Sequence, residues 1–167
     1  MNWLLKLLGC RCEEKNILIN NLNLKIDELN KSSTDLIQPK VLGSININEV
    51  RDLLKNHSSN IQLSDVYYSL TSVDEAKKYS VETKVFAERW VVEKHDCDEF
   101  SFALMGYWNK GLEQFCFGIA WSAGHAFNIM IDSNKQIWIV EPQTNVFTKI
   151  EDVKTNNLYY PLRLILI

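Results

Sequence analysis

The sequence lacks long apolar runs, blocks of like charge and any cysteine framework. No apolar run approaches the roughly 20 residues that a membrane-spanning helix needs, so no transmembrane segment is expected. The net charge is -3 and the pI is near 5.6, with Lys and Arg scattered along the chain. This charge balance argues against a large nucleic-acid footprint. Apolar residues make up 46% of the chain, enough for a packed core.

The four cysteines do not form the pattern of a disulfide scaffold or a zinc site. Cys10 and Cys12 lie close together, whereas Cys97 and Cys116 stand alone. No cysteine pair has a matching histidine pair downstream, as a tetrahedral metal site requires. A chain of this length and apolar content does not need disulfides, so reduced thiols in a cytosolic setting are expected.

The first ten residues bear on localisation. Residues 7–10 (Leu-Leu-Gly-Cys) resemble a bacterial lipoprotein cleavage box, but Lys6 interrupts the apolar stretch and no basic segment precedes it. A cytoplasmic location is therefore favoured over a lipid anchor. The composition, rich in Asn, Ile and Lys, suggests an AT-rich genome, such as that of a low-GC bacterium or its phage.

Residues 1–35 are predicted to form a heptad-patterned amphipathic helix. Apolar residues recur there at alternating steps of three and four, the a/d spacing of a coiled coil. In a homo-oligomer this stripe would pack against its own copy, and in a monomer against the second domain. The stripe consists of Leu5, Leu8, Cys12, Ile19, Leu22, Ile26, Leu29 and Leu36.

Residues 36–167 are predicted to form an α+β domain in which helices precede an antiparallel sheet. Asn48 is a candidate N-cap of a first helix, and Ser72 or Asp74 of a second. Runs rich in β-branched and aromatic residues follow, separated by turn residues. The expected helices cover residues 49–56, a segment near 76–79 and residues 85–92, and the expected strands cover 115–121, 126–131, 136–140 and 160–167.

Cys97 is the candidate nucleophile. Asp96 can cap a helix that begins at Cys97, and the positive end of a helix dipole favours a thiolate. Asp96, Asp98 and Glu99 act in the opposite direction, because nearby carboxylates raise the pKa of a thiol. A divalent cation would neutralise them, and carboxylate oxygens are the ligands that calcium prefers.

His125 and Glu141 are the candidate partners of Cys97. His125 follows a glycine turn and opens a strand, while Glu141 ends the next strand, so an antiparallel hairpin would bring them side by side. Glu141 would then fix the tautomer of His125. Asn128 and Asp132 are rivals for this role. His95 is a weaker candidate for the base, because it precedes the cap on a turn that is expected to be exposed, and His57 is expected to be solvated.

Three short motifs carry a resemblance to known families. Residues 96–100 (Asp-Cys-Asp-Glu-Phe), 124–126 (Gly-His-Ala) and 141–143 (Glu-Pro-Gln) resemble the papain-like domain at the C-terminus of the Marasmius oreades agglutinin and its phage and bacterial relatives. A more distant likeness is to bacterial transglutaminase-like cysteine peptidases. The resemblance covers roughly residues 60–167.

The resemblance implies a papain-like or transglutaminase-like fold and a catalytic role for three residues. Cys97 would be the nucleophile, His125 the base and Glu141 the orienting acid. Both families are calcium-dependent, so Asp96 and Asp98 would be metal ligands. The sequence departs from the family pattern in two respects. No β-trefoil lectin precedes the domain, so glycan binding is not implied, and no glutamine stands at the usual distance before the cysteine.

The function expected from these arguments is that of a cysteine peptidase or a related acyl-transfer hydrolase. It would cleave a peptide or isopeptide amide through a thioester at Cys97. The backbone N–H of Cys97 and the indole of Trp90 are the candidate oxyanion donors. One alternative is a non-catalytic oligomeric scaffold or binding protein with the same fold, and another is an amidase acting on a cell-wall peptide.

Overall fold

The computed structural model describes residues 19–22 and 37–167. The chain divides into two compact units, Met1–Asp35 and Leu36–Ile167. In the first unit, the described residues 19–22 are helical and exposed. The predicted heptad helix, its role in oligomerisation and the cleavage-box motif therefore lie largely outside the described residues. Among the described residues, no helix is both long and apolar enough to cross a membrane.

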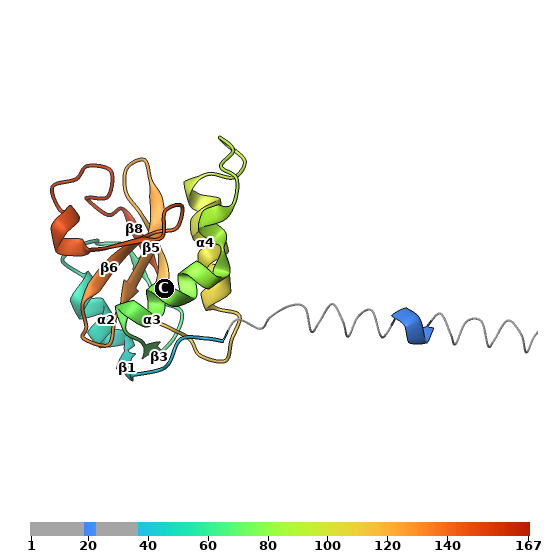
Figure 1. Ribbon diagram of the computed structural model, residues 1–167. Coiled ribbons are helices and arrows are strands. Elements are labelled where there is room, and N and C mark those ends of the chain that lie inside the picture. Colours follow the sequence, from blue (N-terminus) through green and yellow to red (C-terminus); the bar gives the residue numbers. More distant parts are fainter. Residues whose placement is uncertain (1–18, 23–36) are drawn as a thin grey trace, which may run out of the picture. The chain divides into compact units, whose positions relative to one another are not determined.

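The second unit is built around a six-stranded sheet with the order β2-β8-β4-β5-β6-β7 (Figure 1). All neighbouring strands are antiparallel except β2 and β8, which pair in parallel. A separate two-stranded sheet joins β1 to β3. The bounds are β1 Gly43–Asn46, β2 Ile61–Gln62, β3 Tyr67–Leu70, β4 Phe117–Trp121, β5 Ala126–Ile131, β6 Ile137–Glu141, β7 Val146–Lys149 and β8 Leu164–Leu166.

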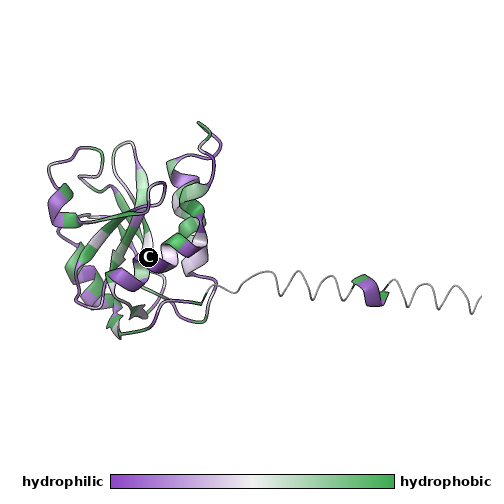
Figure 2. Cartoon of the chain, in the orientation of Figure 1, coloured by the Kyte–Doolittle hydropathy of each residue, from purple (hydrophilic) through white to green (hydrophobic). Residues whose placement is uncertain are grey.

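The central strand β5 separates two apolar clusters. All six of its residues are buried, as expected for a strand that is covered on both faces of the sheet. Phe127 and Ile129 belong to the cluster that includes residues of α2, whereas Met130 belongs to the cluster that includes residues of α3 and α4. Because side chains alternate along a strand, one short segment serves both clusters. The strands of the sheet are accordingly rich in hydrophobic residues (Figure 2).

Three α-helices accompany the sheet: α2 Ile47–Leu54, α3 Val73–Thr83 and α4 Cys97–Trp108. The N-cap of α2 is Asn46 and not Asn48 as predicted. The Asn46 side chain accepts hydrogen bonds from the backbone N–H groups of Asn48 (3.0 Å) and Glu49 (3.1 Å), so the helix begins two residues earlier than predicted. Ser72 caps α3, one of the two predicted possibilities.

The predicted third helix over residues 85–92 is wrong. Only the 3-10 turn Val85–Ala87 forms, and Lys84 before it has a left-handed φ of 60° that separates it from α3. Trp90 and Val92 of the remaining stretch are largely exposed. A helix there would have no core to bury its apolar stripe against, and helices of this length depend on such packing.

The expected separation of helices from an antiparallel sheet is also wrong. Three short strands, β1, β2 and β3, alternate with α2 before α3 and α4 begin, and the main sheet is mixed. The parallel pair joins Ile61 to Ile165 and Gln62 to Leu166, across about a hundred residues of sequence. No local sequence pattern predicts a pairing between strands so far apart in the chain.

Candidate functional site

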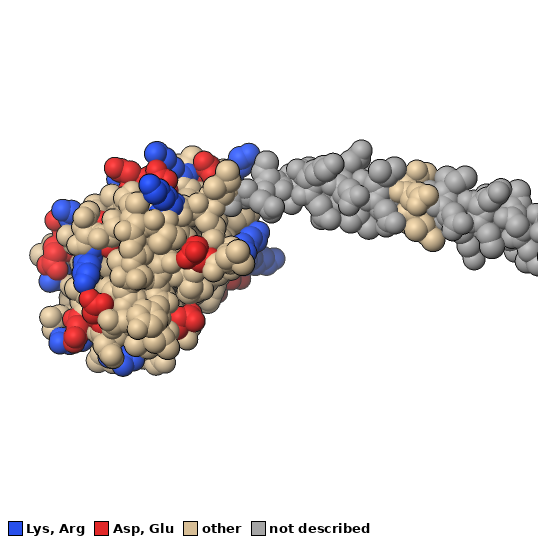
Figure 3. Space-filling model, turned by 90° about the horizontal axis from the view of Figure 1, so that it is seen from below, with Lys and Arg blue, Asp and Glu red and all other residues tan. Residues whose placement is uncertain are grey.

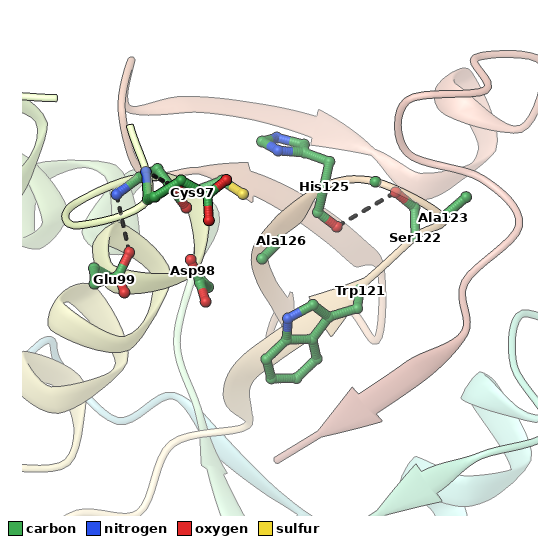
Figure 4. Close-up of a pocket in the computed structure, with 11 residues that line it drawn as sticks. Cys97, Asp98, Glu99, Trp121, Ser122, Ala123, His125 and Ala126 are labelled. Atoms are coloured by element: carbon green, nitrogen blue, oxygen red, sulfur yellow. Dashed lines mark hydrogen bonds between the residues drawn. The ribbon is translucent and has the colours of Figure 1, made fainter. Parts of the chain in front are cut away.

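The first candidate site is a pocket of about 360 Å³, which we call the acidic pocket (Figure 4). It lies where the N-terminus of α4 meets the turn between β4 and β5. Four carboxylate residues contribute to its wall, together with a thiol, an imidazole and an indole. The lining residues are Glu93, Asp96, Cys97, Asp98, Glu99, Trp121, Ser122, Ala123, Gly124, His125 and Ala126.

The position of Cys97 follows from the start of α4. Asp96 is the N-cap residue, and its backbone N–H donates to the Glu99 carboxylate at 2.9 Å. The Asp96 carboxylate in turn accepts from the backbone N–H of Glu93 at 3.0 Å. Ser101 fastens the first turn, since its hydroxyl donates to the Cys97 carbonyl at 2.6 Å. These contacts place Cys97 in the first turn of the helix, as the sequence predicted.

The Cys97 thiol is held in its neutral form. Burial raises the pKa of this thiol, and the charges of Asp96 and Asp98 raise it further, whereas the backbone N–H of Ala126 acts against them. The helix N-terminus therefore does not prevail over burial and the neighbouring carboxylates. Figure 4 draws the sulfur on the side of the pocket where the His125 ring lies, but among the described residues no hydrogen bond joins the two.

Asp96 and Asp98 form a close pair of acids. A hydrogen bond with Asp96 and then burial raise the pKa of the Asp98 carboxyl, and the same hydrogen bond lowers the pKa of Asp96. Ligand atoms of Asp96, Cys97 and Asp98 all lie within 4.8 Å of one another. Two carboxylates at this spacing fit a calcium ion by donor type, because calcium takes oxygen ligands. The thiol is not a ligand of the kind that calcium prefers.

His125 turns its ring toward Glu141. Its Nε2 lies 2.7 Å from Glu141 Oε2, and both side chains are only 11% exposed. The hydroxyl of Tyr159 donates to the same oxygen at 3.1 Å. Burial, followed by the charge of Glu141, raises the pKa of Tyr159 to about 12. The structure thus joins His125 to Glu141, and it places His125 in one pocket with Cys97, Asp96 and Asp98.

The rivals considered for these roles have structural partners. The Asn128 amide is fully buried and donates to the carbonyls of Ser101 (2.9 Å) and Gly118 (3.0 Å), which ties α4 to the sheet. Asp132 accepts from the Trp138 indole at 2.9 Å. His95 pairs with Glu88 at 2.8 Å and packs on Phe100. His57 is buried elsewhere, beside Tyr160.

Three residues of this region were not singled out for the site from the sequence. Tyr159 comes from an irregular segment before β8, and nothing in its sequence context links it to Glu141. The Ser122 hydroxyl donates to the Leu158 carbonyl at 2.5 Å and so fastens that segment to the turn before His125. Trp121 ends β4, is half-buried and lines the acidic pocket.

Comparison with known proteins identifies a shared fold. No family model and no curated protein matches the chain. Among solved structures, one described as a complex of PSL1a with E64 matches with a TM-score of 0.61 and 20% identity. It covers 74% of this chain and 51% of that chain. The Polyporus squamosus lectin bound to the human-type influenza-binding epitope Neu5Aca2-6Galb1-4GlcNAc matches with a TM-score of 0.58 and 20% identity, covering 74% of this chain and 49% of that chain.

The chain therefore shares its fold with about half the length of the solved chains it matches. One of these neighbours is described as a lectin, and the main sheet of the chain is mixed. These findings correct the predicted papain-like or transglutaminase-like α+β class and the predicted family. They overturn the assignment as a hydrolase in the same way.

Local physics explains why the three motifs misled. Asp96 and Glu99 are what the start of α4 requires, Gly124 belongs to the turn before β5, and Glu141 ends a strand. Each motif thus describes a helix cap, a turn or a strand end. Unrelated activities can use the same local features, since function depends on the site as a whole.

Proposed function

We propose that this chain is a non-catalytic binding protein and that the acidic pocket is its ligand site. The observation that carries the proposal is the composition of that pocket. Two neighbouring carboxylates, Asp96 and Asp98, line it together with the indole of Trp121 and the thiol of Cys97, whose pKa is raised. Such a wall offers hydrogen-bond acceptors, charge and an apolar surface, but no preformed nucleophile.

A calcium ion held by Asp96 and Asp98 is part of the proposal. Without a cation, the carboxyl group of Asp98 lies against the carboxylate of Asp96, and this contact is the largest cause of the raised pKa of Asp98. A bound cation would remove the repulsion and would offer further coordination positions to oxygen atoms of a ligand. Glu93 and Glu99 line the same pocket and add to the negative potential that attracts a cation.

We propose a carbohydrate as the ligand class. One matched structure is a lectin bound to a sialylated trisaccharide, which makes sugars the first class to test. The chemistry of the pocket agrees with that choice, because sugar hydroxyls donate to carboxylates and the C–H face of a sugar ring packs on an indole. Four carboxylate residues would repel an anionic sugar. A neutral sugar, or an anionic one bound through the cation, fits the site.

The test is a calorimetric titration of the purified chain with calcium, followed by titration with neutral and sialylated oligosaccharides with and without calcium. We expect calcium binding that is lost in Asp98→Asn, and sugar binding that needs both calcium and Trp121. Asp152→Asn is the matched control, because Asp152 is exposed and lies outside the pocket. Sugar binding that is equal with and without calcium would contradict the role of the cation.

Turnover is the outcome that would remove the proposal altogether. The same samples are incubated with a mixed peptide substrate, and cleavage is followed by mass spectrometry. We expect no cleavage that depends on Cys97. Cleavage that disappears in Cys97→Ala and persists in Cys116→Ala would show that the chain is an enzyme. Cys116 suits this control because burial raises the pKa of its thiol to about 12 and keeps it unreactive.

A further inference from the structure

Phe102 exposes an aromatic ring beside the acidic pocket. It is 51% exposed, although α4 buries Phe100, Leu104 and Trp108. Its ring packs against that of Trp121, which lines the pocket. The two ring centroids are 5.9 Å apart, and the ring planes are inclined by 58°. We call this pair the aromatic platform. The contact between the rings leaves about half of Phe102 open to solvent.

The aromatic platform continues the wall of the acidic pocket. Phe102 follows Asp98 by four residues, so the two side chains lie on one face of α4, about one helical turn apart. Asp98 lines the pocket, whereas Phe102 extends the same face beyond its rim. Figure 4 shows the Trp121 indole turned toward the side of the pocket where Asp98 lies. A ligand that leaves the pocket along α4 would therefore pass over Phe102.

The pocket and the platform offer a ligand different chemistry. The pocket offers carboxylates and, under the proposed function, a calcium ion. Phe102 offers only an apolar face. A ligand that uses both needs oxygen atoms at one end and a second apolar face about one helical turn away. Successive rings of an oligosaccharide meet this requirement, because each ring has hydroxyl groups on its edge and C–H groups on its face.

We infer that the aromatic platform binds a second sugar ring, so that the ligand is an oligosaccharide of at least two rings. This inference rests on the proposed function, since it names the class of sugar that the same site takes. The first ring meets the carboxylates, the cation and the Trp121 indole. The second ring covers the exposed face of Phe102. Phe102 thus determines specificity for the length of the ligand.

The test compares galactose with lactose, and glucose with maltose, by calorimetric titration of the full chain in the presence of calcium. We expect at least one disaccharide to bind about fivefold to tenfold more tightly than its monosaccharide, the effect of covering an exposed phenyl face. Phe102→Ala should abolish this preference and leave the affinities for calcium and for monosaccharides unchanged. Phe102→Tyr keeps the ring and should keep the preference. Leu112→Ala is the matched control, because it removes another exposed apolar side chain outside the pocket.

The outcomes separate this inference from the proposed function. Equal affinity for monosaccharides and disaccharides in the wild type would overturn the second ring and leave the binding protein intact. Absence of binding by all four sugars and by sialylated oligosaccharides would overturn both. A preference that survives in Phe102→Ala would also overturn the inference. The same holds if that variant loses monosaccharide affinity to the same extent, because Phe102 would then act through the pocket.

A second readout is the NMR signal of the Phe102 ring protons. Lactose or maltose should shift this signal, whereas galactose and glucose should leave it in place. An unshifted signal at saturation with the tighter disaccharide would contradict contact between Phe102 and a second ring.

Discussion

The acidic pocket and a second cavity of about 390 Å³, the apolar pocket, both have His125 in their walls, but their carboxyl groups have different partners. In the acidic pocket, Asp96 and Asp98 are partly exposed neighbours in one helical turn, and the pKa of Asp98 is raised by its contact with Asp96 and by burial. In the apolar pocket, Glu141 is buried but has two partners, the His125 ring and the Tyr159 hydroxyl. Glu141 thus has two side-chain partners, whereas Asp98 lies against another acid, Asp96, whose own carboxylate accepts a hydrogen bond from the backbone N–H of Glu93.

This difference indicates which kind of ligand each pocket favours. A cation would stabilise two carboxylates in close contact, so under the proposed function a metal ion would bind in the acidic pocket before the oxygen atoms of a sugar. In the apolar pocket, the Glu141 carboxylate already has the His125 ring and the Tyr159 hydroxyl as partners, so it does not call for a cation. Outside the pockets, acidic and basic side chains are intermingled on the face drawn in Figure 3.

The largest expected effect is a loss of folding stability when the hydrogen bonds that hold α4 against the sheet are removed. Asn128→Leu removes the two hydrogen bonds that tie α4 to the sheet, and it leaves the carbonyls of Ser101 and Gly118 buried without that donor. We expect a loss of about 2–4 kcal/mol in the free energy of unfolding, measured by urea denaturation. Asn48→Leu is the control, since Asn48 is exposed. A loss of the same size in both variants would contradict the account.

The second prediction breaks the acidic pocket alone. Asp98→Asn keeps the shape of the side chain but removes one of the two charges that would hold the cation. We expect calcium affinity to fall by about tenfold or more, as expected when a charged ligand is lost, while folding stability is unchanged or increased. Calorimetry measures the affinity. An unchanged affinity in Asp98→Asn would place the metal elsewhere or exclude it.

The third prediction concerns pH. Because the pKa of Asp98 is raised, protons compete with the cation at a higher pH than for an ordinary aspartate, whose pKa is about 3.9. Calcium affinity should therefore be full near neutrality and should weaken as the pH falls toward the acid range. Titrations at several pH values measure this dependence. Asp98→Asn should largely remove it, and a dependence that survives in this variant would assign it to another group.

The smallest expected effect falls on the apolar pocket. Tyr159→Phe removes one donor to Glu141 but leaves His125 in place. We expect a loss of about 1 kcal/mol in the free energy of unfolding, with no change in calcium affinity. Tyr67→Phe is the control, because Tyr67 is exposed on β3. Weakened calcium binding in Tyr159→Phe would show that the two pockets do not act separately.

The elements closest to the site could be predicted from the sequence because their signals are local. The predicted strands 126–131 and 136–140 agree with β5 and β6, and the cap at Asp96 starts α4 as expected. Hairpin register then follows from the turn, which is why the contact between His125 and Glu141 could be anticipated. Runs of β-branched residues and caps are short-range features, and the sequence displays them directly.

The rest depends on contacts between distant segments. The pairing of β2 with β8 and the hydrogen bond from Tyr159 to Glu141 join irregular or very short segments that carry no periodic signal. The raised pKa of Cys97 is also a tertiary effect, since burial is its largest cause. The sequence displayed the helix dipole and the carboxylates but not the burial. The prediction of Cys97 as the nucleophile therefore took account of the helix dipole and the carboxylates, but not of the burial of the thiol.

The central claim, that the site binds and does not catalyse, is tested most directly by the alkylation rate of Cys97. Iodoacetamide labelling is followed by mass spectrometry with and without calcium, in the wild type and in His125→Ala. The account predicts slow labelling of Cys97, no faster than that of the unfolded chain and independent of His125, because the thiol stays neutral. Fast labelling that requires His125 and increases with calcium would contradict it and would identify an activated cysteine.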